Sequence, residues 1–428
     1  MVNIPQDYLS PRWTGELCDC SMPLTLDTYN HCSYNCLYCF AYFQKGISNI
    51  NHDIHSVNPN AIKNLFLSAL KDKTPKGYSN EIKPYVKNRI TMQWGGLGDA
   101  FDENERKYGV TLELLKFFDK IDYPLSISTK ATWWTEDERY MSIIKKHTHN
   151  WHFKISIITL DPMKSYLIEQ GVPTPQERLK AIKRLSSAGL NVTLRLRPYI
   201  IGISEDYPLL IHKASEAGAN SVSTEFFCVE NHRVTPALQH KYDKISEVVG
   251  YDLRKFYKEN SKKNIGYHRL NYDLKKPIIE DMRKIAHEHK MYFYVSDAHH
   301  KEKCDNLCCC GTPPHFKVYE GHYAKALQIA KSRPNHIVEW EDIEPTAEQI
   351  FGHIPIITAM GFNTSGTRWR AKYRKTSMSK YLRTIWNTPS MPKSPYKYFE
   401  GTLYPIGKNK NNNIIYKYNT KKTKKQYD

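Results

Sequence analysis

Three cysteines in one short loop are the residues of this chain best suited to chemistry. The segment Cys32-Ser33-Tyr34-Asn35-Cys36-Leu37-Tyr38-Cys39 has a C-x3-C-x2-C spacing and comes directly after a predicted strand at residues 24–29. Three thiolates on a tight loop can bind three irons of a cubane cluster. The fourth iron then has no protein ligand, and an open coordination position is what a catalytic metal needs. The loop therefore predicts a 4Fe-4S cluster that is open to a small ligand.

A structural zinc ion is the alternative for the same loop. Zinc in such a site normally takes four ligands, and His31 is the neighbouring candidate for the fourth. Because His31 is adjacent to Cys32, shared coordination of one ion by both side chains is awkward. We therefore favour the iron–sulfur cluster.

A second group of cysteines lies further along the chain, with four thiols in seven positions: Cys304, Cys308, Cys309 and Cys310. This density predicts an auxiliary iron–sulfur cluster or a zinc site. Adjacent cysteines do not all reach one ion comfortably, so Cys18, Cys20 or Cys228 could complete the ligand set. Redox-active or hydrogen-donor thiols, and unligated cysteines that close a barrel, are the alternatives. We interpret the nearby histidines as surface residues: His287, His289, His299 and His300.

An alternation of strands and helices is expected to position the cysteine loop. Apolar residues recur with a period of two in some segments and of about 3.6 in the segments between them. Strands are predicted at 24–29, 90–94, 125–129, 153–160, 191–201 and 221–229, and helices at 58–72, 105–122, 136–147, 175–188 and 207–217. Right-handed βα units of this kind build a parallel sheet. The predicted fold is thus α/β, a partial (βα)6 TIM-type barrel, in which function collects on loops after the strand C-termini.

The rest of the chain is expected to close and extend this barrel. Residues 230–275 read as an irregular, charged insertion, followed by a helix at 276–289 and a strand at 291–296. The predicted organisation has four parts: a lead at 1–22, the barrel at 23–230, an insertion with a cysteine-bearing closing element at 231–320, and a C-terminal region with a basic, aromatic-rich tail at 321–428.

The cysteine loop, with Tyr38 directly before its last cysteine, resembles the radical SAM superfamily. The resemblance implies that Cys32, Cys36 and Cys39 bind a 4Fe-4S cluster and that S-adenosylmethionine chelates the open iron through its amino and carboxylate groups. It also implies that one-electron reduction releases a 5′-deoxyadenosyl radical, which abstracts a hydrogen from the substrate. An electron donor such as flavodoxin or ferredoxin is the expected partner.

Further segments resemble the family's cofactor contacts. The loop Gly95-Gly96-Leu97-Gly98-Asp99 is similar to the Gly-Gly-Glu-Pro loop that receives the methionine amino group, and glycine there lets backbone carbonyls approach a ligand. A plain βα turn is the alternative for this loop. Ser128-Thr129-Lys130, at the end of the third strand, could bind the ribose and the methionine carboxylate.

The fifth strand and the segment after it offer further candidate cofactor contacts. Arg195 and Arg197 alternate on the fifth strand, so both face one side, and charges that face a barrel interior need an anion. The segment from Pro198 to Glu205 resembles the adenine-contacting segment, and Ser156 is a weaker candidate. We take Arg195 and Glu205 as candidate cofactor-binding residues.

Over residues 23–230 the chain resembles the spore photoproduct lyase branch and its "DNA repair photolyase-like" relatives. The segments that carry this resemblance lie at 95–101, 105–111, 126–130, 156–161 and 171–179. Two features depart from the photoproduct lyases. Phe40 stands where they have a tyrosine, and no cysteine lies between Cys39 and Cys228 to serve as their hydrogen donor. Cys228 is the candidate substitute donor, with a small buried apolar residue as the alternative.

The positive charge is concentrated at the C-terminus. The chain has a formal net charge of +18, and residues 361–428 hold 16 lysines and arginines against 2 acidic residues. Basic residues alternate with aromatics at 368–375 and 396–399, a pattern that suits a nucleic acid. The runs at 408–413 and 421–425 read instead as a solvated tail.

Composition bounds the remaining possibilities. Hydrophobic residues make up 40% of the chain, which excludes wholesale disorder. No run of 18 apolar residues is present, so we expect no membrane segment. The first residues lack the build of a signal peptide, so we expect a cytoplasmic protein.

The sequence therefore predicts a radical SAM enzyme, lyase or transferase-like, that modifies or repairs a nucleic acid. Modification of a peptide or small molecule is one alternative. A non-enzymatic iron–sulfur protein that binds nucleic acid is the other.

Overall fold

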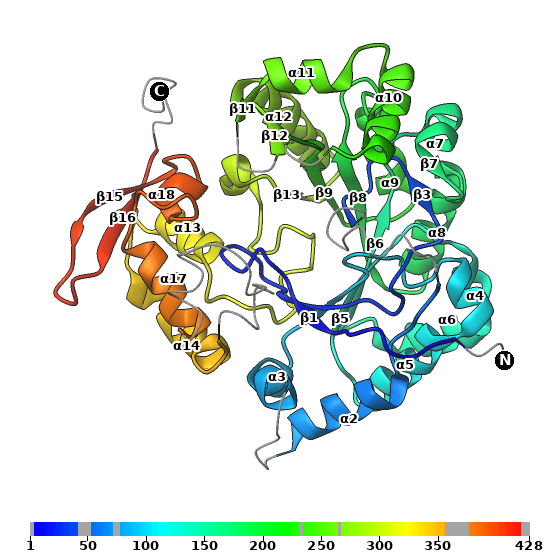
Figure 1. The fold of residues 1–428 in the computed structure, drawn as a ribbon, viewed down its shortest axis with the longest axis horizontal. Helices are drawn as coiled ribbons and strands as arrows, with labels where there is room; N and C mark the ends of the chain where they lie inside the picture. Colours follow the sequence, from blue (N-terminus) through cyan, green and yellow to red (C-terminus); the bar gives the residue numbers. More distant parts are fainter. Residues whose placement is uncertain are drawn as a thin grey trace.

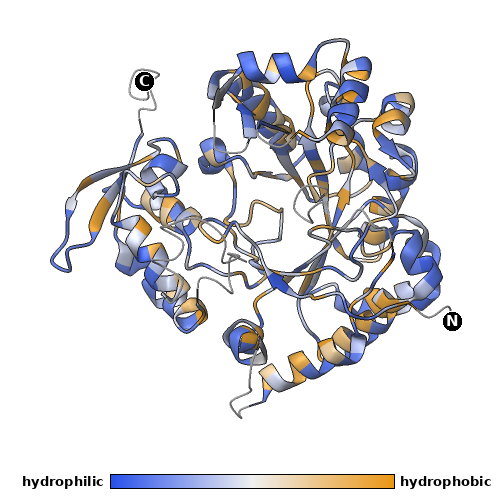
Figure 2. Cartoon of the chain, in the orientation of Figure 1, coloured by the Kyte–Doolittle hydropathy of each residue, from blue (hydrophilic) through white to orange (hydrophobic). Residues whose placement is uncertain are grey.

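The computed structural model describes residues 4–41, 53–71, 78–231, 234–263, 267–355 and 376–420. Figure 1 shows a large sheet with helices packed around it and a smaller C-terminal lobe beside it. Along these helices apolar and polar residues alternate in colour, as in amphipathic elements that bury one face (Figure 2).

The main sheet has eight strands in the order β1-β2-β4-β5-β6-β8-β9-β13. Strand β1 (Arg12–Trp13) pairs antiparallel with β2, and all other pairs in this sheet are parallel. The parallel strands are β2 (Leu24–Leu26), β4 (Met92–Trp94), β5 (Leu125–Thr129), β6 (Trp151–Ser156), β8 (Asn191–Tyr199), β9 (Ser221–Phe226) and β13 (Tyr292–Val295). The predicted α/β partial barrel is confirmed, and β13, the strand predicted at 291–296, joins the same sheet beside β9.

Helices follow the strands and bury their apolar sides against the sheet. Helix α8 shows why they form where they do, because Pro175 opens it and Thr174 and Glu177 make a capping box at its N-terminus. The helices of this part are α2 (Pro59–Leu70), α3 (Tyr78–Lys87), α4 (Glu103–Tyr108), α5 (Val110–Lys120), α6 (Glu138–Ile144), α7 (Pro162–Ile168), α8 (Pro175–Ser187), α9 (Tyr207–Glu216) and α12 (Tyr272–Glu288). Single turns of 3-10 helix flank α6 at Trp133–Glu136 and Lys145–His147.

The single helix predicted at 105–122 is wrong, because α4 and α5 are separate. Gly109 lies between them with a φ of 71°, a left-handed conformation that ends α4. The buried carboxylate of Glu105 accepts the amides of Thr111 at 2.7 Å and Leu112 at 2.9 Å. It thus caps the first turn of α5, which starts a new helix after the turn.

The irregular insertion predicted at 230–275 is also wrong. Helices α10 (Pro236–Val249) and α11 (Leu253–Glu259) lie here, with a small sheet in the order β10-β12-β11. Its strands are β10 (Cys228–Glu230), β11 (Ser261–Lys263) and β12 (Tyr267–Leu270). The N-cap Thr235 and the left-handed Gly250 bound α10, and these are signals that the charged composition obscured.

A segment without long helices or strands runs from β13 to the lobe and contains the second cysteine group. It begins with a 3-10 helix at Ala298–Lys303 and later donates the Tyr319 amide to the Ser21 carbonyl. The prediction of surface histidines is wrong for His299 and His300, which are 7% and 0% exposed. His299 pairs with Glu400 at 2.8 Å, and His300 stacks on Tyr272.

The C-terminal lobe packs helices against a three-stranded sheet in the order β14-β16-β15. Its core includes the fully buried Trp340 and Trp386. The elements are α13 (Tyr323–Ser332), β14 (Ile337–Val338), a 3-10 turn (Trp340–Asp342), α14 (Glu344–Phe351), α17 (Met378–Trp386), α18 (Pro395–Tyr398), β15 (Leu403–Lys408) and β16 (Ile414–Tyr418). No described helix is long and apolar enough to cross a membrane.

The expected tail divides into folded and undescribed parts. Residues 408–413 are not a solvated tail but the turn between β15 and β16, in which the amide groups of Asn409 and Asn413 donate to Glu341 at 2.8 Å. Tyr396, Lys397, Tyr398 and Phe399 belong to the folded lobe. The basic runs at 368–375 and 421–425 lie outside the described residues.

Candidate active site

The cysteine loop leaves the C-terminal end of β2, the first parallel strand, and is tied to a loop from across the barrel. Strand β3 (Asn35–Cys36) pairs antiparallel with β7 (Glu169–Gln170), and the Leu37 amide donates to the Ile168 carbonyl at 2.9 Å. Cys36 is buried, whereas Cys32 and Cys39 are partly exposed. The loop is thus fixed in shape while two of its thiols stay within reach of a ligand.

A buried ion pair holds Tyr38. The Tyr38 hydroxyl donates to Glu169, and Glu169 pairs with Arg178 at 2.7 Å, with both charged side chains fully buried. Although burial raises the pKa of Glu169, Arg178 and Lys130 outweigh this effect and hold the pKa below its usual value. The ionised Glu169 therefore fixes the Tyr38 ring directly before Cys39.

The other side of the loop rests on the N-terminus of α4. Asp102 accepts the Ser33 amide at 2.6 Å, and Asn104 donates to the His31 carbonyl at 3.3 Å. Burial raises the pKa of Asp102 to about 7 and is also the main cause that raises the pKa of Cys32. Burial raises the pKa of Cys36 to about 12, so a metal ion would have to displace the protons of these thiols.

The glycine loop after β4 lies at the same strand ends. Gly95 has a φ of +84°, and a Cβ there would stand 2.5 Å from the Ser128 carbonyl oxygen, so only glycine fits. Asp27 accepts the amides of Leu97 at 2.8 Å and Gly98 at 3.1 Å. A Cβ on Gly96 would meet the Thr25 side chain at 2.4 Å. The backbone of the glycine loop after β4 therefore packs tightly against the end of β5, and Asp27 fixes its shape.

Asp99 connects this loop to the end of β5. Its carboxylate accepts the Thr129 hydroxyl at 2.7 Å and the Lys130 amide at 2.6 Å. These bonds fix the end of β5 against the glycine loop, and contact between Asp99 and a cofactor stays a prediction.

Ser128 and Lys130 lie at the end of β5, where Lys130 faces the cysteine loop. The buried hydroxyl of Ser128 has no hydrogen-bond partner among the described residues. The Lys130 ammonium lies 5.7 Å from the centre of the Tyr38 ring. Burial lowers the pKa of Lys130, but Cys36, Glu169 and Asp99 reverse the effect and leave the pKa raised. A free hydroxyl and a stable cation beside three cysteines fit a polar ligand that carries an anionic group.

The remaining predicted residues are not gathered at this loop. Arg195 faces Arg197, Glu225 and the second cysteine group. Glu205 is exposed and accepts the Gly202 amide at 3.0 Å in the turn after β8.

The sequence placed Cys228 at the end of the sixth strand. In the structure it is instead the first residue of β10, two residues after the end of β9. Its thiol is 3.7 Å from the Phe226 carbonyl, and burial raises its pKa to about 12. Its role as hydrogen donor stays a prediction. Phe40, at the position where the photoproduct lyases have tyrosine, is 48% exposed.

The second cysteine group enters the barrel interior. The Cys304 thiol contacts the backbone of Val295 at 3.2 Å, Cys308 contacts Thr312 at 3.4 Å, and Cys310 lies 3.8 Å from Gln93 of β4. A metal bound by Cys304, Cys308, Cys309 and Cys310 stays a prediction here.

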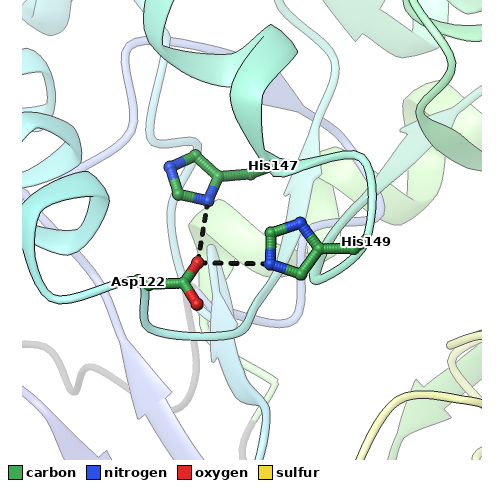
Figure 3. Close-up of side chains that lie close together, drawn as sticks. All are labelled: Asp122, His147 and His149. Atoms are coloured by element: carbon green, nitrogen blue, oxygen red, sulfur yellow. Dashed lines mark ion pairs between the residues drawn. The ribbon is translucent and has the colours of Figure 1, made fainter.

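Within the described ranges, one group of three side chains has ligand atoms that all lie within 4.8 Å of one another: Asp122, His147 and His149. Figure 3 shows both histidines paired to the Asp122 carboxylate, each at 3.3 Å. Asp122 precedes β5 and the histidines precede β6, so the group lies at the strand N-termini, at the opposite end from the cysteine loop. It is not part of the candidate site.

Sequence reasoning missed two residues that hold the cysteine loop, Glu169 and Arg178, and a buried cation near the second cysteine group, Lys154. Lys154 could have been found, since it alternates with His152 and Ser156 on β6 as Arg195 does with Arg197 on β8. Glu169 and Arg178 could not, because their pairing depends on how α7 and α8 pack.

Comparisons with known proteins give similarity but no family assignment. No protein-family model matches the chain. Uncharacterized proteins of Mycobacterium bovis and Mycobacterium tuberculosis are 25% identical over 202 residues, which are 46% of this chain and 57% of those proteins. The chain thus spans little more than half the length of these relatives.

Among solved structures, two kinds of protein have a similar fold. A spore photoproduct lyase complexed with dinucleoside spore photoproduct has a TM-score of 0.49 and 14% identity, covering 68% of this chain and 81% of that one. Streptococcus suis SuiB bound to its precursor peptide SuiA has a TM-score of 0.40 and 18% identity, covering 64% of this chain and 49% of that one.

Proposed function

We propose that this chain is a radical SAM enzyme in which Cys32, Cys36 and Cys39 bind a 4Fe-4S cluster. The observation that carries this proposal is the position of the three thiols at the end of the first parallel strand, on a loop held by Glu169 and Asp102. Loops at the C-terminal ends of barrel strands are where such folds place their chemistry.

Residues around the loop fit S-adenosylmethionine as the second ligand. The close backbone at Gly95 and Gly96 would receive its amino group, the partnerless hydroxyl of Ser128 its ribose, and the Lys130 ammonium its carboxylate. The cluster and S-adenosylmethionine, when bound, supply a carbon radical that abstracts hydrogen. The protein's own part is to keep Lys130 charged, to hold Tyr38 in place and to cover the thiols. We also propose flavodoxin or ferredoxin as electron donor.

The test of this reaction is anaerobic reconstitution with iron, sulfide and a reductant, followed by assay for 5′-deoxyadenosine. Wild-type protein should release it from S-adenosylmethionine, and Cys36→Ala should not. Cys18→Ala is the matched control, since Cys18 is an equally buried thiol outside the loop. Absence of 5′-deoxyadenosine from reconstituted wild type would refute the enzyme and leave a non-enzymatic iron–sulfur protein.

We further propose a nucleic acid as the substrate, docked at the C-terminal lobe. A groove of about 660 Å³ is lined by Tyr396, Lys397 and Tyr404, together with Ser390 and Asn419. The Lys397 ammonium lies 5.4 Å from the centre of the Tyr396 ring. Aromatic rings beside a lysine can stack on bases and neutralise phosphate.

Binding of single-stranded DNA and RNA tests this docking. Removing one stacking ring should weaken binding by about 1–3 kcal/mol, so we expect Tyr404→Ala to lose roughly 5-fold to 150-fold in affinity. Tyr292→Ala, which removes a half-exposed ring on β13, is the control. Equal affinities and salt slopes for both variants would refute the nucleic-acid substrate and favour a peptide or small molecule.

A further inference from the structure

The barrel interior holds a segment of chain that carries cysteines. The carbonyl of Cys309 accepts from Arg197 and from Ser223, the latter at 2.9 Å, and the carbonyl of Gly311 accepts from Thr193 at 3.1 Å. These donors alternate along β8 and β9 on the face that points into the barrel. A Cβ on Gly311, whose φ is +81°, would stand 2.6 Å from Thr193. We call this segment, Cys304–Thr312, the plug.

A distant cysteine meets the plug from the N-terminal side. Cys20 lies between β1 and β2, and the two residues after it contact the plug: the Ser21 hydroxyl donates to the Leu307 carbonyl at 3.5 Å, and the Thr312 hydroxyl lies 3.4 Å from the Met22 sulfur. Within the plug, the Cys308 thiol contacts the same Thr312 hydroxyl at 3.4 Å, and the Cys310 thiol lies 3.8 Å from Gln93 of β4. Four thiols from two ends of the sequence thus converge inside the barrel.

Three cations surround these thiols. Lys154 is fully buried, and its ammonium has no hydrogen-bond partner among the residues that the structure describes. The same holds for the buried Nη1 of Arg195 and the Nε of Arg197. Cys310 is among the charged neighbours of all three.

The described residues offer these three positive side chains too little negative charge to neutralise them. The carboxylate nearest to Arg197 in the described ion pairs is Glu225 at 3.7 Å, and it is 46% exposed. Leaving a buried charge without compensation costs several kcal/mol per ion. The interior is therefore built to surround an anion.

The thiols themselves identify that anion. Cysteine binds metals as thiolate, so a metal–thiolate centre is negatively charged and would satisfy the three cations. In a tetrahedral zinc site with Zn–S of about 2.3 Å, the sulfurs stand about 3.8 Å apart. No three cysteine sulfurs of the described chain lie within 4.8 Å of one another. The thiols are thus not gathered as in a single tetrahedral zinc site, and a cluster, in which each thiolate binds its own metal, fits them better.

We propose that Cys20, Cys308, Cys309 and Cys310 bind a second iron–sulfur cluster inside the barrel, with Lys154, Arg195 and Arg197 as its counter-charges. This site is independent of the Cys32–Cys39 loop and goes beyond the proposed reaction. Such a cluster explains two features at once: the four clustered thiols, and three cationic side chains that each have a buried nitrogen without a hydrogen-bond partner among the described residues.

Iron and sulfide analysis after anaerobic reconstitution tests the ligands. A variant with Cys32, Cys36 and Cys39 all replaced by alanine should retain iron and acid-labile sulfide. Adding Cys20→Ala should remove most of both, whereas adding Cys18→Ala should not. Because Cys20 lies outside the plug, this variant tests the site even where Cys309→Ala prevents folding. Loss of all iron in the triple variant, or full retention with Cys20→Ala, would overturn the proposal.

The cations have a separate readout. A cation beside a cluster favours its reduced, more negative form, so Lys154→Met should shift the midpoint potential of the second cluster to a more negative value. The triple variant isolates this cluster for a redox titration followed by electron paramagnetic resonance. Lys146→Met, which removes an exposed lysine paired with Asp119, is the control. An unchanged midpoint potential in Lys154→Met would refute the role of the cations as counter-charges.

Discussion

The two cysteine groups differ in the charged side chains around them. At the loop, besides burial, the carboxylates of Asp102 and Asp99 raise the pKa of Cys32, whereas the Lys130 ammonium lowers the pKa of Cys36. At the plug, the cations Lys301 and Arg197 lower the pKa of Cys309, although its interaction with Cys310 and burial leave that pKa raised overall. Charges of both signs thus surround the loop, whereas cations are the main charged neighbours of the plug.

The two groups also differ in how the fold fixes them. The loop is gripped through side chains of other elements, namely Glu169, Asp102 and Asn104. The plug is held through its carbonyls at Cys309 and Gly311, which accept from the side chains of Arg197, Ser223 and Thr193. Carboxylates and an amide thus hold the loop, whereas hydroxyls and a guanidinium hold the plug.

The largest expected effect follows from breaking the buried ion pair under the loop. Glu169→Gln leaves Arg178 buried without a charged partner, which should cost roughly 3–5 kcal/mol of unfolding free energy. Urea unfolding measures the loss. Arg184→Ala, which removes an ion pair with the exposed Glu136, should cost no more than about 1 kcal/mol.

Glu169→Gln also tests whether the cysteine loop and the plug bind iron independently. Glu169→Gln should reduce the iron held by the Cys32–Cys39 loop and leave the iron that depends on Cys20 unchanged. Equal loss from both groups would show that the loop and the plug are not held independently.

Two glycines, Gly95 beside the cysteine loop and Gly311 in the plug, allow the packing of the two regions to be compared directly. Gly95→Ala forces a Cβ to 2.5 Å from the Ser128 backbone, whereas Gly311→Ala meets only the Thr193 side chain at 2.6 Å. Backbone moves less readily than a side chain, so we expect about 3 kcal/mol of destabilisation for Gly95→Ala and about half of that for Gly311→Ala. Thermal unfolding of both variants gives the comparison.

A double variant and a control complete this test. Thr193→Ser removes one of the two atoms that a Cβ on Gly311 would meet, so it should recover part of the stability lost in Gly311→Ala. Gly109→Ala has a similar positive φ with open space around it, so it should show the cost of the backbone conformation alone. A larger loss for Gly311→Ala than for Gly95→Ala would contradict the comparison.

Much of this site could be predicted from the sequence, and the part that could not depends on long-range packing. Cys32, Cys36 and Cys39 are close in sequence and follow a strand, so their spacing alone predicts a metal loop. The parallel sheet follows from the alternation of periods, which is a local signal. Cys20 and Cys310 are 290 residues apart, and only the path of the plug through the barrel brings them together.

Two errors have a local cause instead. The single helix expected at 105–122 is divided because Glu105, a residue of α4, caps the N-terminus of α5 with its side chain. The periodicity of apolar residues does not reveal such a cap. The insertion at 230–275 folds because caps at Thr235 and Gly250 outweigh its charged composition.

Acidification should act with opposite sign on the two regions. Burial lowers the pKa of His322, whose ring lies 3.0 Å from the Ser21 hydroxyl beside Cys20, to about 3. Its folded pKa is below the unfolded value of about 6.5, so its stabilisation is present above pH 6.5 and is lost as the pH falls toward 3. Between pH 7.5 and pH 5 this loss amounts to about 2 kcal/mol.

Asp102, under the Cys32–Cys39 loop, has the reverse sign. Burial raises its pKa from 3.8 to about 7, so the folded state favours the protonated form, and the associated stability is lost as the pH rises toward 7. In metal-free protein, His322→Gln should therefore lose about 2 kcal/mol less than wild type on going from pH 7.5 to pH 5. Asp102→Asn should gain about 2 kcal/mol less than wild type over the same interval. Urea unfolding at the two pH values measures both differences, with His149→Gln, an exposed histidine, as the control. Shifts of the same sign in both variants would contradict the assignment of a neutral histidine to the plug side and a buried acid to the loop.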